Sequence, residues 1–541
     1  MGSGIVTQQN NLKRLRTAER AQANGEYGVA TPLYQRVLEN DPQQPMALHN
    51  LSCIYLDQTK LVDAEALLKR LFAATGFVDV KPMNTYATVL IRQRRVEEAV
   101  QVLWKAKELD PNFPQTLINL SAAYLNLEDS DSALHYAFEA LKIDIGNKHA
   151  FNNLGSAYGN LAMFEEAAIA FETAIDLDPN FFEAILNFGG LVARNNNHAK
   201  AIEIYETARL RMSETLRSQE DVIRYYLAFS QLRSGMLKEA WENYEGGFHP
   251  NILKANSRSP HRKFKVPKWT GEPLEHKKLL IWREQGLSDE ILFMSCLRDL
   301  TPHLNNIIVE CDKRMVSSFA RSFPEITCRE QNADLAFNAV YDDFDYHLPM
   351  GSLMRFTRPT LEAFENSKPY IVVDENLLAD FRARLDRVAA GRKTIGIAWR
   401  SGISNALRAL EATTLQDWAP ILAKRDACFV NLQYGDCETE IKAVEEKFGI
   451  EIIRWDDLDL KDDLDGIFAL MKGLDYIVST GTAVYSMAGA VGANGYIIKT
   501  TQSWQEFNLT YNPWYKNLKI YKNIENNIPL LLEKIGADIF D

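Results

Sequence analysis

The sequence predicts an α-helical superhelix followed by an α/β region of two facing, parallel-sheet domains. Three observations lead to this prediction. The first half of the chain repeats with a period of 34 residues, the period stops near residue 247, and apolar strands alternate with helices beyond residue 276. The chain has 541 residues, of which 46% are hydrophobic, so it is long enough for several domains with buried cores.

The charge and the cysteines exclude several classes of protein. A formal net charge of −12 at pH 7 argues against a nucleic-acid backbone as the main partner. The six cysteines form no CxxC pair, which is typical of reduced thiols in a cytoplasmic protein. The N-terminus MGSGIVTQQN lacks the apolar stretch of a secretion signal, and no run of eighteen apolar residues occurs. We therefore expect a cytoplasmic protein that does not insert into a membrane.

The 34-residue period is the length of the tetratricopeptide repeat, a pair of antiparallel helices. The clearest copies align Leu117, Leu120 and Tyr124 with Phe151, Leu154 and Tyr158, and then with Ile185, Phe188 and Val192. The middle copy also has Gly155 at the helix crossing and Pro179 in the closing turn. Earlier copies and a looser last copy bring the total to about seven helical pairs over residues 1–247, which predicts a superhelix with a concave groove.

Asparagine occupies the same position of the first helix in four repeats: Asn50, Asn119, Asn153 and Asn187. Apolar packing does not need an amide there, and this helix lines the concave side of the superhelix. The column therefore predicts that the groove binds the backbone of an extended acceptor peptide. The alternative is that the amides only cap or bridge neighbouring helices.

Residues 248–275 form a domain junction, because they are basic and contain Pro260, Pro267 and Pro273. We expect a solvated linker there rather than a nucleic-acid site. Beyond it, segments such as KLLIW, NIIVEC, TIGIAW and YIVS alternate with helical stretches, which predicts parallel sheets with helices on both faces. A charged helix over residues 376–390, ending at Gly391, separates an N-terminal domain (276–391) from a C-terminal domain (392–541).

Polar residues follow several of the predicted strands, at the sheet edge where such folds bind ligands. The first strand is followed by Gly286, Ser288, Asp289 and Glu290. Three strands of the last domain are followed, in order, by Arg400, Ser401 and Gly402, by Gln433 and Tyr434, and by Thr480, Gly481, Thr482 and Ala483. A helix N-terminus lined by hydroxyls suits a phosphate, and Arg400 would add a positive charge. The residues together predict a nucleotide site, with ordinary strand-to-helix turns as the alternative.

An acidic run, WDDLDLKDDLDG, lies in the same domain. Asp463 is our candidate there for a ligand to ribose or sugar hydroxyls. The alternative is that these carboxylates begin a helix, where the helix dipole favours them.

The tracts PKWTGEPLEHKKLLIWREQGLSDEILF, IGIAWRSG, NLQYG, LDYIVSTGTAVYSMAGAVG and YNPWY resemble tetratricopeptide-repeat proteins fused to a glycosyltransferase domain of the GT-B fold. That domain is similar to the heptosyltransferases. The whole chain resembles bacterial flagellin glycosyltransferases and, more remotely, O-linked N-acetylglucosamine transferases, whose asparagine ladder the column matches. The expected fold is thus a repeat superhelix followed by two facing Rossmann-like domains.

The resemblance implies that Asp289 is the catalytic base, that the anomeric carbon is inverted, and that neither a metal nor a cofactor is needed besides the nucleotide-sugar donor. Glu290 is the nearest alternative base. The chain departs from the family at Ser288, which replaces a glycine, and at Gly481 and Ser486, which replace the aspartate and histidine of an Asp-Thr-Ala-Val…His pattern. Because of these departures, the alternative is a degenerate domain that binds its ligands but does not catalyse transfer.

Our hypothesis is a protein O-glycosyltransferase that moves a sugar to serine or threonine of an acceptor held by the repeats. The resemblance implies flagellin as the acceptor, and a nonulosonic acid on CMP, or a UDP- or dTDP-sugar, as the donor. Two alternatives stand beside it: a transferase for polysaccharide or lipid-linked acceptors, and a repeat scaffold or flagellin chaperone with a degenerate transferase domain.

Overall fold

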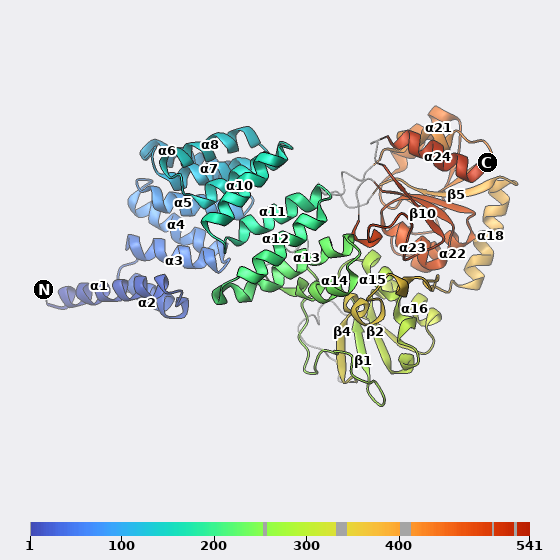
Figure 1. Ribbon diagram of the computed structural model, residues 1–541, viewed down its shortest axis with the longest axis horizontal. Helices are drawn as coiled ribbons and strands as arrows, with labels where there is room; N and C mark the ends of the chain where they lie inside the picture. Colours follow the sequence, from blue (N-terminus) through green and yellow to red (C-terminus); the bar gives the residue numbers. More distant parts are fainter. Residues whose placement is uncertain are drawn as a thin grey trace. The chain divides into compact units, whose positions relative to one another are not determined.

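The computed structural model describes residues 2–250, 252, 257–331, 343–400, 413–499, 503–523 and 527–541 (Figure 1). The chain divides into two compact units, Met1–Glu214 and Thr215–Asp541, which we call unit 1 and unit 2. Among the described segments, no helix has the length and apolar character needed to cross a bilayer.

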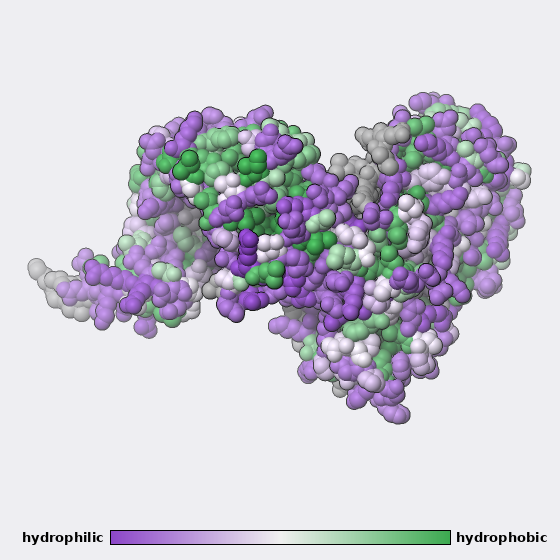
Figure 2. Space-filling model, viewed as in Figure 1, coloured by the Kyte–Doolittle hydropathy of each residue, from purple (hydrophilic) through white to green (hydrophobic). Residues whose placement is uncertain are grey.

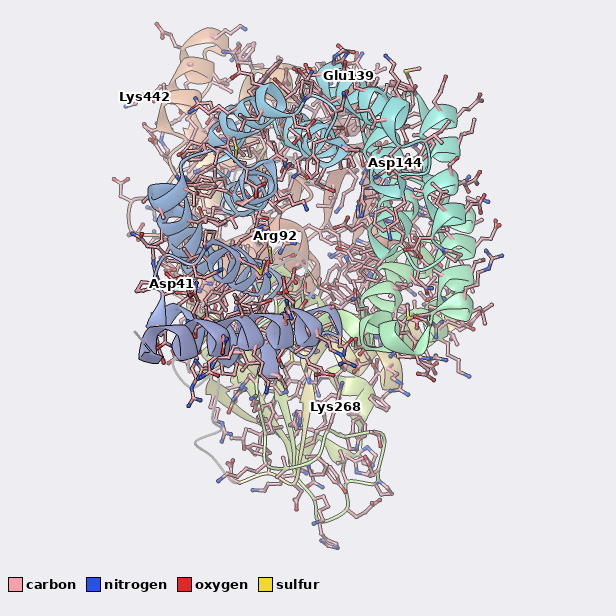
Figure 3. All side chains as sticks on the ribbon, turned by 90° about the vertical axis from the view of Figure 1, so that its left-hand side faces the viewer. Asp41, Arg92, Glu139, Asp144, Lys268 and Lys442 are labelled. Atoms are coloured by element: carbon pink, nitrogen blue, oxygen red, sulfur yellow. The ribbon has the colours of Figure 1, made fainter. Side chains whose placement is uncertain are left out.

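Unit 1 is an array of antiparallel helical pairs, which confirms the helical repeats expected from the sequence. Its helices are α1 (Gly2–Ala23), α2 (Tyr27–Asn40), α3 (Pro45–Asp57), α4 (Leu61–Thr75), α5 (Val80–Arg92), α6 (Val96–Leu109), α7 (Pro114–Asn126), α8 (Ser130–Ile143), α9 (Lys148–Asn160), α10 (Phe164–Leu177), α11 (Phe182–Arg194) and α12 (His198–Arg211). Figure 3 shows the pairs following a curve, with Arg92 of α5 on the inner side and Glu139 of α8 on the outer side.

Small residues at the repeat spacing let the two helices of each pair approach closely. Ala99, Ala133, Ala167 and Ala201 are fully buried at intervals of 34 residues. Gly155 lies at a crossing so tight that a Cβ atom there would be 2.7 Å from the ring of Phe171. The period seen in the sequence therefore marks the buried seam between helices.

Unit 2 begins with a further helical pair, α13 (Glu220–Arg233) and α14 (Leu237–Tyr244). The sequence predicts repeats as far as residue 247, but this pair groups with the α/β region. The reason is its packing: Trp241 of α14 lies edge-on to Trp504, with ring centroids 6.0 Å apart, and its indole N–H donates to the carbonyl of Arg358. The pair is thus part of the aromatic core of unit 2.

The junction after α14 is not solvated throughout. Arg258 is fully buried, where its guanidinium pairs with Glu284 and Glu245 and lies over the rings of Tyr244 and Phe248. Arg262 pairs with Glu310 at 2.6 Å. The expectation of a solvated basic linker is wrong for these two residues, because carboxylates distant in sequence draw them into the fold.

Two sheets, in which every strand pair is parallel, make up the rest of unit 2. The first has the order β3-β2-β1-β4, with β1 (Leu279–Trp282), β2 (Ile307–Cys311), β3 (Thr327–Glu330) and β4 (Tyr346–Pro349). The second has the order β10-β9-β8-β5-β6-β7, with β5 (Lys393–Ala398), β6 (Ala427–Asn431), β7 (Ile452–Ile453), β8 (Tyr476–Thr480), β9 (Gly495–Lys499) and β10 (Leu518–Lys522). The prediction of parallel sheets is confirmed.

Helices accompany both sheets: α15 (Leu287–Met294), α16 (Val316–Ser322), α17 (Met354–Thr357), α18 (Glu375–Ala389), α20 (Ala419–Leu422), α21 (Glu438–Phe448), α22 (Leu464–Gly473), α23 (Ala483–Val491) and α24 (Ile528–Phe540). The helix α18 is the predicted charged helix between the sheets. In the second sheet, β5 lies at the point where the chain reverses the direction in which it adds strands, between β6 and β8. Open parallel sheets bind ligands at the carboxyl ends of the strands beside such a switch point.

Candidate functional site

The switch point of the second sheet places a helix N-terminus at the carboxyl end of β8. Thr482 is the N-cap of α23, and its hydroxyl accepts a hydrogen bond from the backbone N–H of Val484 at 3.3 Å. The predicted site residues Thr480, Gly481, Thr482 and Ala483 therefore lie together in the turn that opens α23. The free N–H groups and the dipole of this helix favour an anion there.

A lysine that the sequence analysis did not select lies beside this turn. Lys499 is the last residue of β9, and its side chain is only 7% exposed. Its ammonium group lies 5.1 Å from the ring centroid of Tyr485. A Cβ atom at Gly481 would be 2.8 Å from that ammonium, so the glycine makes room for it. The sequence feature that could have identified Lys499 as a site residue is its position at the carboxyl end of a parallel strand.

The hydroxyl of Thr480 adds a polar group to the same turn. Thr480 is 2% exposed, and its Oγ1 has no hydrogen-bond partner among the residues that the structure describes. A buried hydroxyl without a partner costs about 1 to 3 kcal/mol. The helix N-terminus and the lysine are groups that bind the oxygens of a phosphate.

Arg400 and Gln433, predicted as donor contacts, are bound within the protein. The guanidinium of Arg400 contacts Glu440 of α21, with Nη2 2.6 Å from Oε1, and donates to the carbonyl of Asp436. The buried amide oxygen of Gln433 accepts from the backbone N–H groups of Trp399 and Arg400, which joins the end of β5 to β6. A ligand phosphate would therefore have to displace Glu440 to reach Arg400. Ser401 and Gly402 lie outside the described residues.

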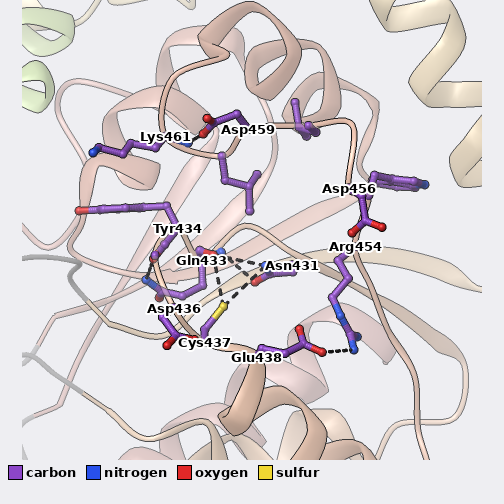
Figure 4. A pocket seen from close by; sticks show the side chains of 14 residues that line it. Asn431, Gln433, Tyr434, Asp436, Cys437, Glu438, Arg454, Asp456, Asp459 and Lys461 are labelled. Atoms are coloured by element: carbon purple, nitrogen blue, oxygen red, sulfur yellow. Dashed lines mark hydrogen bonds and ion pairs between the residues drawn. The ribbon is translucent and has the colours of Figure 1, made fainter.

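A pocket of about 490 Å³ opens beyond the ends of β6 and β7 (Figure 4). Tyr434 and Lys461 lie on one side of it, and Arg454, which pairs with Glu438 at 3.1 Å, lies on the other. The volume and the mixture of aromatic and polar groups suit a nucleoside-sized ligand. Tyr434 was predicted from the sequence, and the wall formed by residues 454–461 includes Asp456 and Asp459 of the acidic run that the sequence analysis singled out.

The last part of the acidic run stabilises the fold, whereas its first part, with Asp456 and Asp459, lines the pocket. Asp463 is exposed and caps α22, since its Oδ1 accepts from the N–H of Gly466 at 2.9 Å. Asp465 accepts hydrogen bonds from Ser317, Ser318 and Arg321 of α16. Asp463 therefore begins a helix, as the alternative prediction stated, and Asp465 joins α22 to α16 beside the first sheet.

Asp289 and Glu290, the two candidate bases, have different surroundings at the start of α15. Asp289 is partly exposed, and its Oδ2 accepts from the N–H of Gly286 at 3.3 Å. Glu290 is fully buried; it accepts from the N–H of Asp312 at 2.9 Å and lies 2.9 Å from Arg283. Burial raises the pKa of Glu290 to about 7. Of the two, Asp289 is the one that an acceptor hydroxyl can approach.

The asparagine column connects successive repeats. The side-chain N–H groups of Asn119, Asn153 and Asn187 donate to Asn84 Oδ1 (2.8 Å), the Ile118 carbonyl (3.1 Å) and Asn152 Oδ1 (3.0 Å), each 35 residues earlier. Asn50 donates to the hydroxyl of Tyr34 at 3.1 Å. The bridging role, which was the alternative for this column, is therefore present, and the amide oxygen of Asn119 also accepts a hydrogen bond from the side chain of Gln115 at 2.9 Å.

Comparison with known proteins agrees with the repeats. Residues 15–77 and 149–181 match tetratricopeptide repeat families. Protein FlbA of Caulobacter vibrioides is 29% identical over 530 residues, which is 95% of this chain and 87% of that protein. The TPR repeat-containing protein YpiA of Bacillus subtilis is 21% identical over 43% of this chain and 45% of its own length.

Among solved structures, a tetratricopeptide repeat protein from Parabacteroides merdae covers 46% of this chain and 96% of its own, at 14% identity and a TM-score of 0.38. The family matches show tetratricopeptide repeats in unit 1, and the similarity to Protein FlbA extends through both units.

Proposed function

We propose that this protein is a glycosyltransferase whose unit 2 binds a nucleotide-activated sugar and whose repeats hold a protein acceptor. The observation that carries the proposal is the arrangement at the start of α23. There the ammonium of Lys499 lies beside Gly481, in the turn that opens the helix N-terminus at the switch point of a parallel sheet.

The donor would lie along the carboxyl edge of the second sheet. Its nucleoside fits the pocket beside Tyr434, and its phosphate fits the turn that Lys499 and Thr482 border. As the bond to the sugar breaks, the leaving phosphate gains charge, which the ammonium and the helix N–H groups stabilise. This role depends on the fixed position of the Lys499 ammonium.

The acceptor hydroxyl would be activated by Asp289. The first turns of α15 and α23 adjoin, because the hydroxyls of Ser288 and Ser486 are hydrogen-bonded at 2.8 Å. The turn that carries Asp289 is thus next to the turn assigned to the phosphate. The carboxylate takes the proton of the acceptor hydroxyl while the oxygen of that hydroxyl attacks the anomeric carbon from the face opposite the phosphate. The configuration at the anomeric carbon therefore inverts. The resemblance suggests flagellin as the acceptor.

A repeat scaffold with a degenerate second unit is the other candidate function. It is favoured by the capping contact of Asp289 and by the pairing of Arg400 with Glu440. The scaffold needs no nucleotide, so binding of nucleotides separates the two functions.

The test is calorimetric titration with CMP, UDP, GDP and dTDP. We expect one nucleotide to bind and Lys499→Met to weaken it at least tenfold. Lys519→Met, at a 66% exposed side chain of the neighbouring strand β10, is the matched control and should bind normally. If the wild-type protein bound none of the four nucleotides, the transferase proposal would be rejected.

A further inference from the structure

The helical pair α13 and α14 supports the start of α15 in unit 2 (Figure 1). The ring centroid of Tyr244 in α14 lies 6.4 Å from that of Phe293 in α15. Figure 2 shows polar and apolar residues mixed on the visible face of unit 2. The contacts of the pair lie beneath such a surface, because Trp241 is 1% exposed and Tyr244 2%. The pair is therefore an internal support of the helix that carries Asp289.

The turn between β1 and α15 has an uncommon backbone conformation at Gln285. Its φ angle is +60°, in the left-handed region that glutamine rarely adopts. Such a conformation persists only where neighbouring groups hold it. Here the backbone N–H of Gln285 donates to the carbonyl of Ser259 at 2.7 Å, and its side-chain N–H donates to the hydroxyl of Tyr244 at 2.7 Å. Tyr244 is therefore one of the groups that hold this turn.

The preceding residue, Glu284, is fixed by the same cluster of side chains. Its buried carboxylate accepts from Arg258 Nε at 2.6 Å and from the N–H of Gly351 at 2.8 Å. The guanidinium carbon of Arg258 lies 4.4 Å from the ring centroid of Tyr244. A Cβ atom at Gly351 would be 2.8 Å from Glu284 Oε1 and 3.1 Å from the ring of Tyr244. This close packing leaves the turn little freedom to shift relative to α14.

The turn in its turn holds the carboxylate of Asp289. Oδ2 of Asp289 accepts from the N–H of Gly286 at 3.3 Å, and that N–H belongs to the peptide group that joins Gln285 to Gly286. Because the peptide group is planar, a rotation at Gln285 moves this N–H relative to the carboxylate. Burial raises the pKa of Tyr244 well above its ordinary value, and the charges of Glu284 and Asp289 raise it further. The hydroxyl that holds Gln285 is therefore neutral.

We propose that Tyr244 is a positioning residue for the turn that carries Asp289. Its hydroxyl holds Gln285, and Gln285 sets the N–H that holds the carboxylate. The inference rests on the proposed function, in which Asp289 is the base. Misplacement of a reacting group by about 1 Å can lower a rate by about 10²-fold, so the loss of one of these hydrogen bonds should be measurable in turnover. The helices α13 and α14 thereby form part of the support of the proposed active site.

Hydrogen exchange of the full-length protein, followed by mass spectrometry, tests this contact without any substrate. Tyr244→Phe removes the hydroxyl and keeps the ring, so the segment 282–290 should exchange about threefold faster or more. The matched control is Tyr496→Phe, which removes the hydroxyl of another buried tyrosine, bonded to the carbonyl of Asp538 at 3.3 Å. This control should leave the exchange of residues 282–290 unchanged.

Turnover is measured as the release of CMP from CMP-N-acetylneuraminic acid or of UDP from UDP-N-acetylglucosamine, with flagellin as the acceptor. Tyr244→Phe should lower kcat about tenfold and change the donor KM less than about twofold, because the donor site keeps its residues. Gln285→Asn tolerates the positive φ angle but is shorter by one methylene, so it should lower kcat equally. The double variant should be no slower than either single variant, because all three lose the same interaction.

Unchanged exchange together with unchanged kcat in Tyr244→Phe would overturn the inference, and so would additive losses in the double variant. A lower melting temperature with an unchanged kcat would also overturn it, because the hydroxyl would then only stabilise the fold. If the wild type released neither nucleotide, the proposed function would fail with these donors. Faster exchange in Tyr244→Phe would even then show that Tyr244 holds the turn.

Discussion

Ser288 and Ser486, 198 residues apart in the chain, share a hydrogen bond of 2.8 Å between their hydroxyls. One lies in the first turn of α15, beside the first sheet, and the other lies in α23, beside the second. These are two of the positions at which the chain departs from the heptosyltransferase-like pattern. The two serines contact each other, so the departures form one polar contact between the two α/β regions.

Loss of either serine should destabilise unit 2. Ser486 is fully buried, so Ser288→Ala leaves its hydroxyl without this partner, at a cost of about 1 to 3 kcal/mol. The double variant should cost less than the sum of the two single variants, because it removes both hydroxyls. Urea unfolding of all four proteins measures this. Ser234→Ala, whose hydroxyl bonds to its own helix, is the control; purely additive losses would show that the two hydroxyls are not coupled.

Substitution of Asp289 should separate catalysis from capping. The side-chain amide introduced by Asp289→Asn keeps an oxygen to accept the N–H of Gly286, so stability and nucleotide affinity should be unchanged. Turnover should fall by about 10²-fold or more, because the base is lost. Asp289→Ala should in addition lose about 1 kcal/mol of stability. Turnover of Asp289→Asn equal to that of the wild type would remove Asp289 as the base.

Substitution of Asn153 tests the role of the asparagine column. Asn153 is 7% exposed and bonds to the carbonyl of Ile118 in the preceding repeat. If the column bridges repeats, Asn153→Ala should lower the unfolding free energy of unit 1 by about 1 kcal/mol. The control is Asn126→Ala, since the amide of Asn126 is exposed and bonds within its own helix. Unchanged thermal stability with weaker acceptor binding would instead favour the peptide role.

Unit 2 should lose stability as the pH falls below about 6.5. His347 stacks on Phe264 with ring centroids 3.9 Å apart, and its Nδ1 accepts from the indole N–H of Trp282. Burial, with Lys268 and Arg262 nearby, lowers the pKa of His347 to about 4. Between pH 6.5 and 4 the unfolded chain therefore binds a proton that the folded chain does not, and the unfolding free energy decreases as the pH falls.

Urea unfolding at about pH 7.5 and about pH 5, on either side of the ordinary histidine pKa, measures this contribution. His347→Gln should lose less stability between the two values than the wild type, and His276→Asn, at an exposed histidine, should behave like the wild type. An identical loss in all three proteins would assign the pH dependence to other groups.

Much of the architecture follows from local patterns. Ala99, Ala133 and Ala167 repeat every 34 residues because each must fit between two helices, and this requirement is visible without coordinates. Strands β5 and β8 are buried at every residue after the first because a parallel sheet is covered on both faces. The turn that begins α23 was also predictable from a local pattern, because hydroxyls and a glycine that follow a buried strand indicate an open helix N-terminus.

Charged and amide side chains were less predictable, because their partners are far away in the sequence. Arg400 was expected to contact a phosphate, yet Glu440 is within 2.6 Å of it. Arg258 was expected in solvent and is buried by carboxylates 13 and 26 residues away. Lys499 was overlooked until the fold placed its ammonium beside Gly481.

The order of amino acids by itself determined the repeat period, the parallel strands and the edge of the sheet where polar residues gather, because each depends on neighbours within about one element. The tertiary structure decided which carboxylate each arginine meets, which turn Lys499 borders, and that Ser288 meets Ser486. Electrostatic and hydrogen-bond energies vary over a few ångströms, and only the folded chain sets distances at that scale.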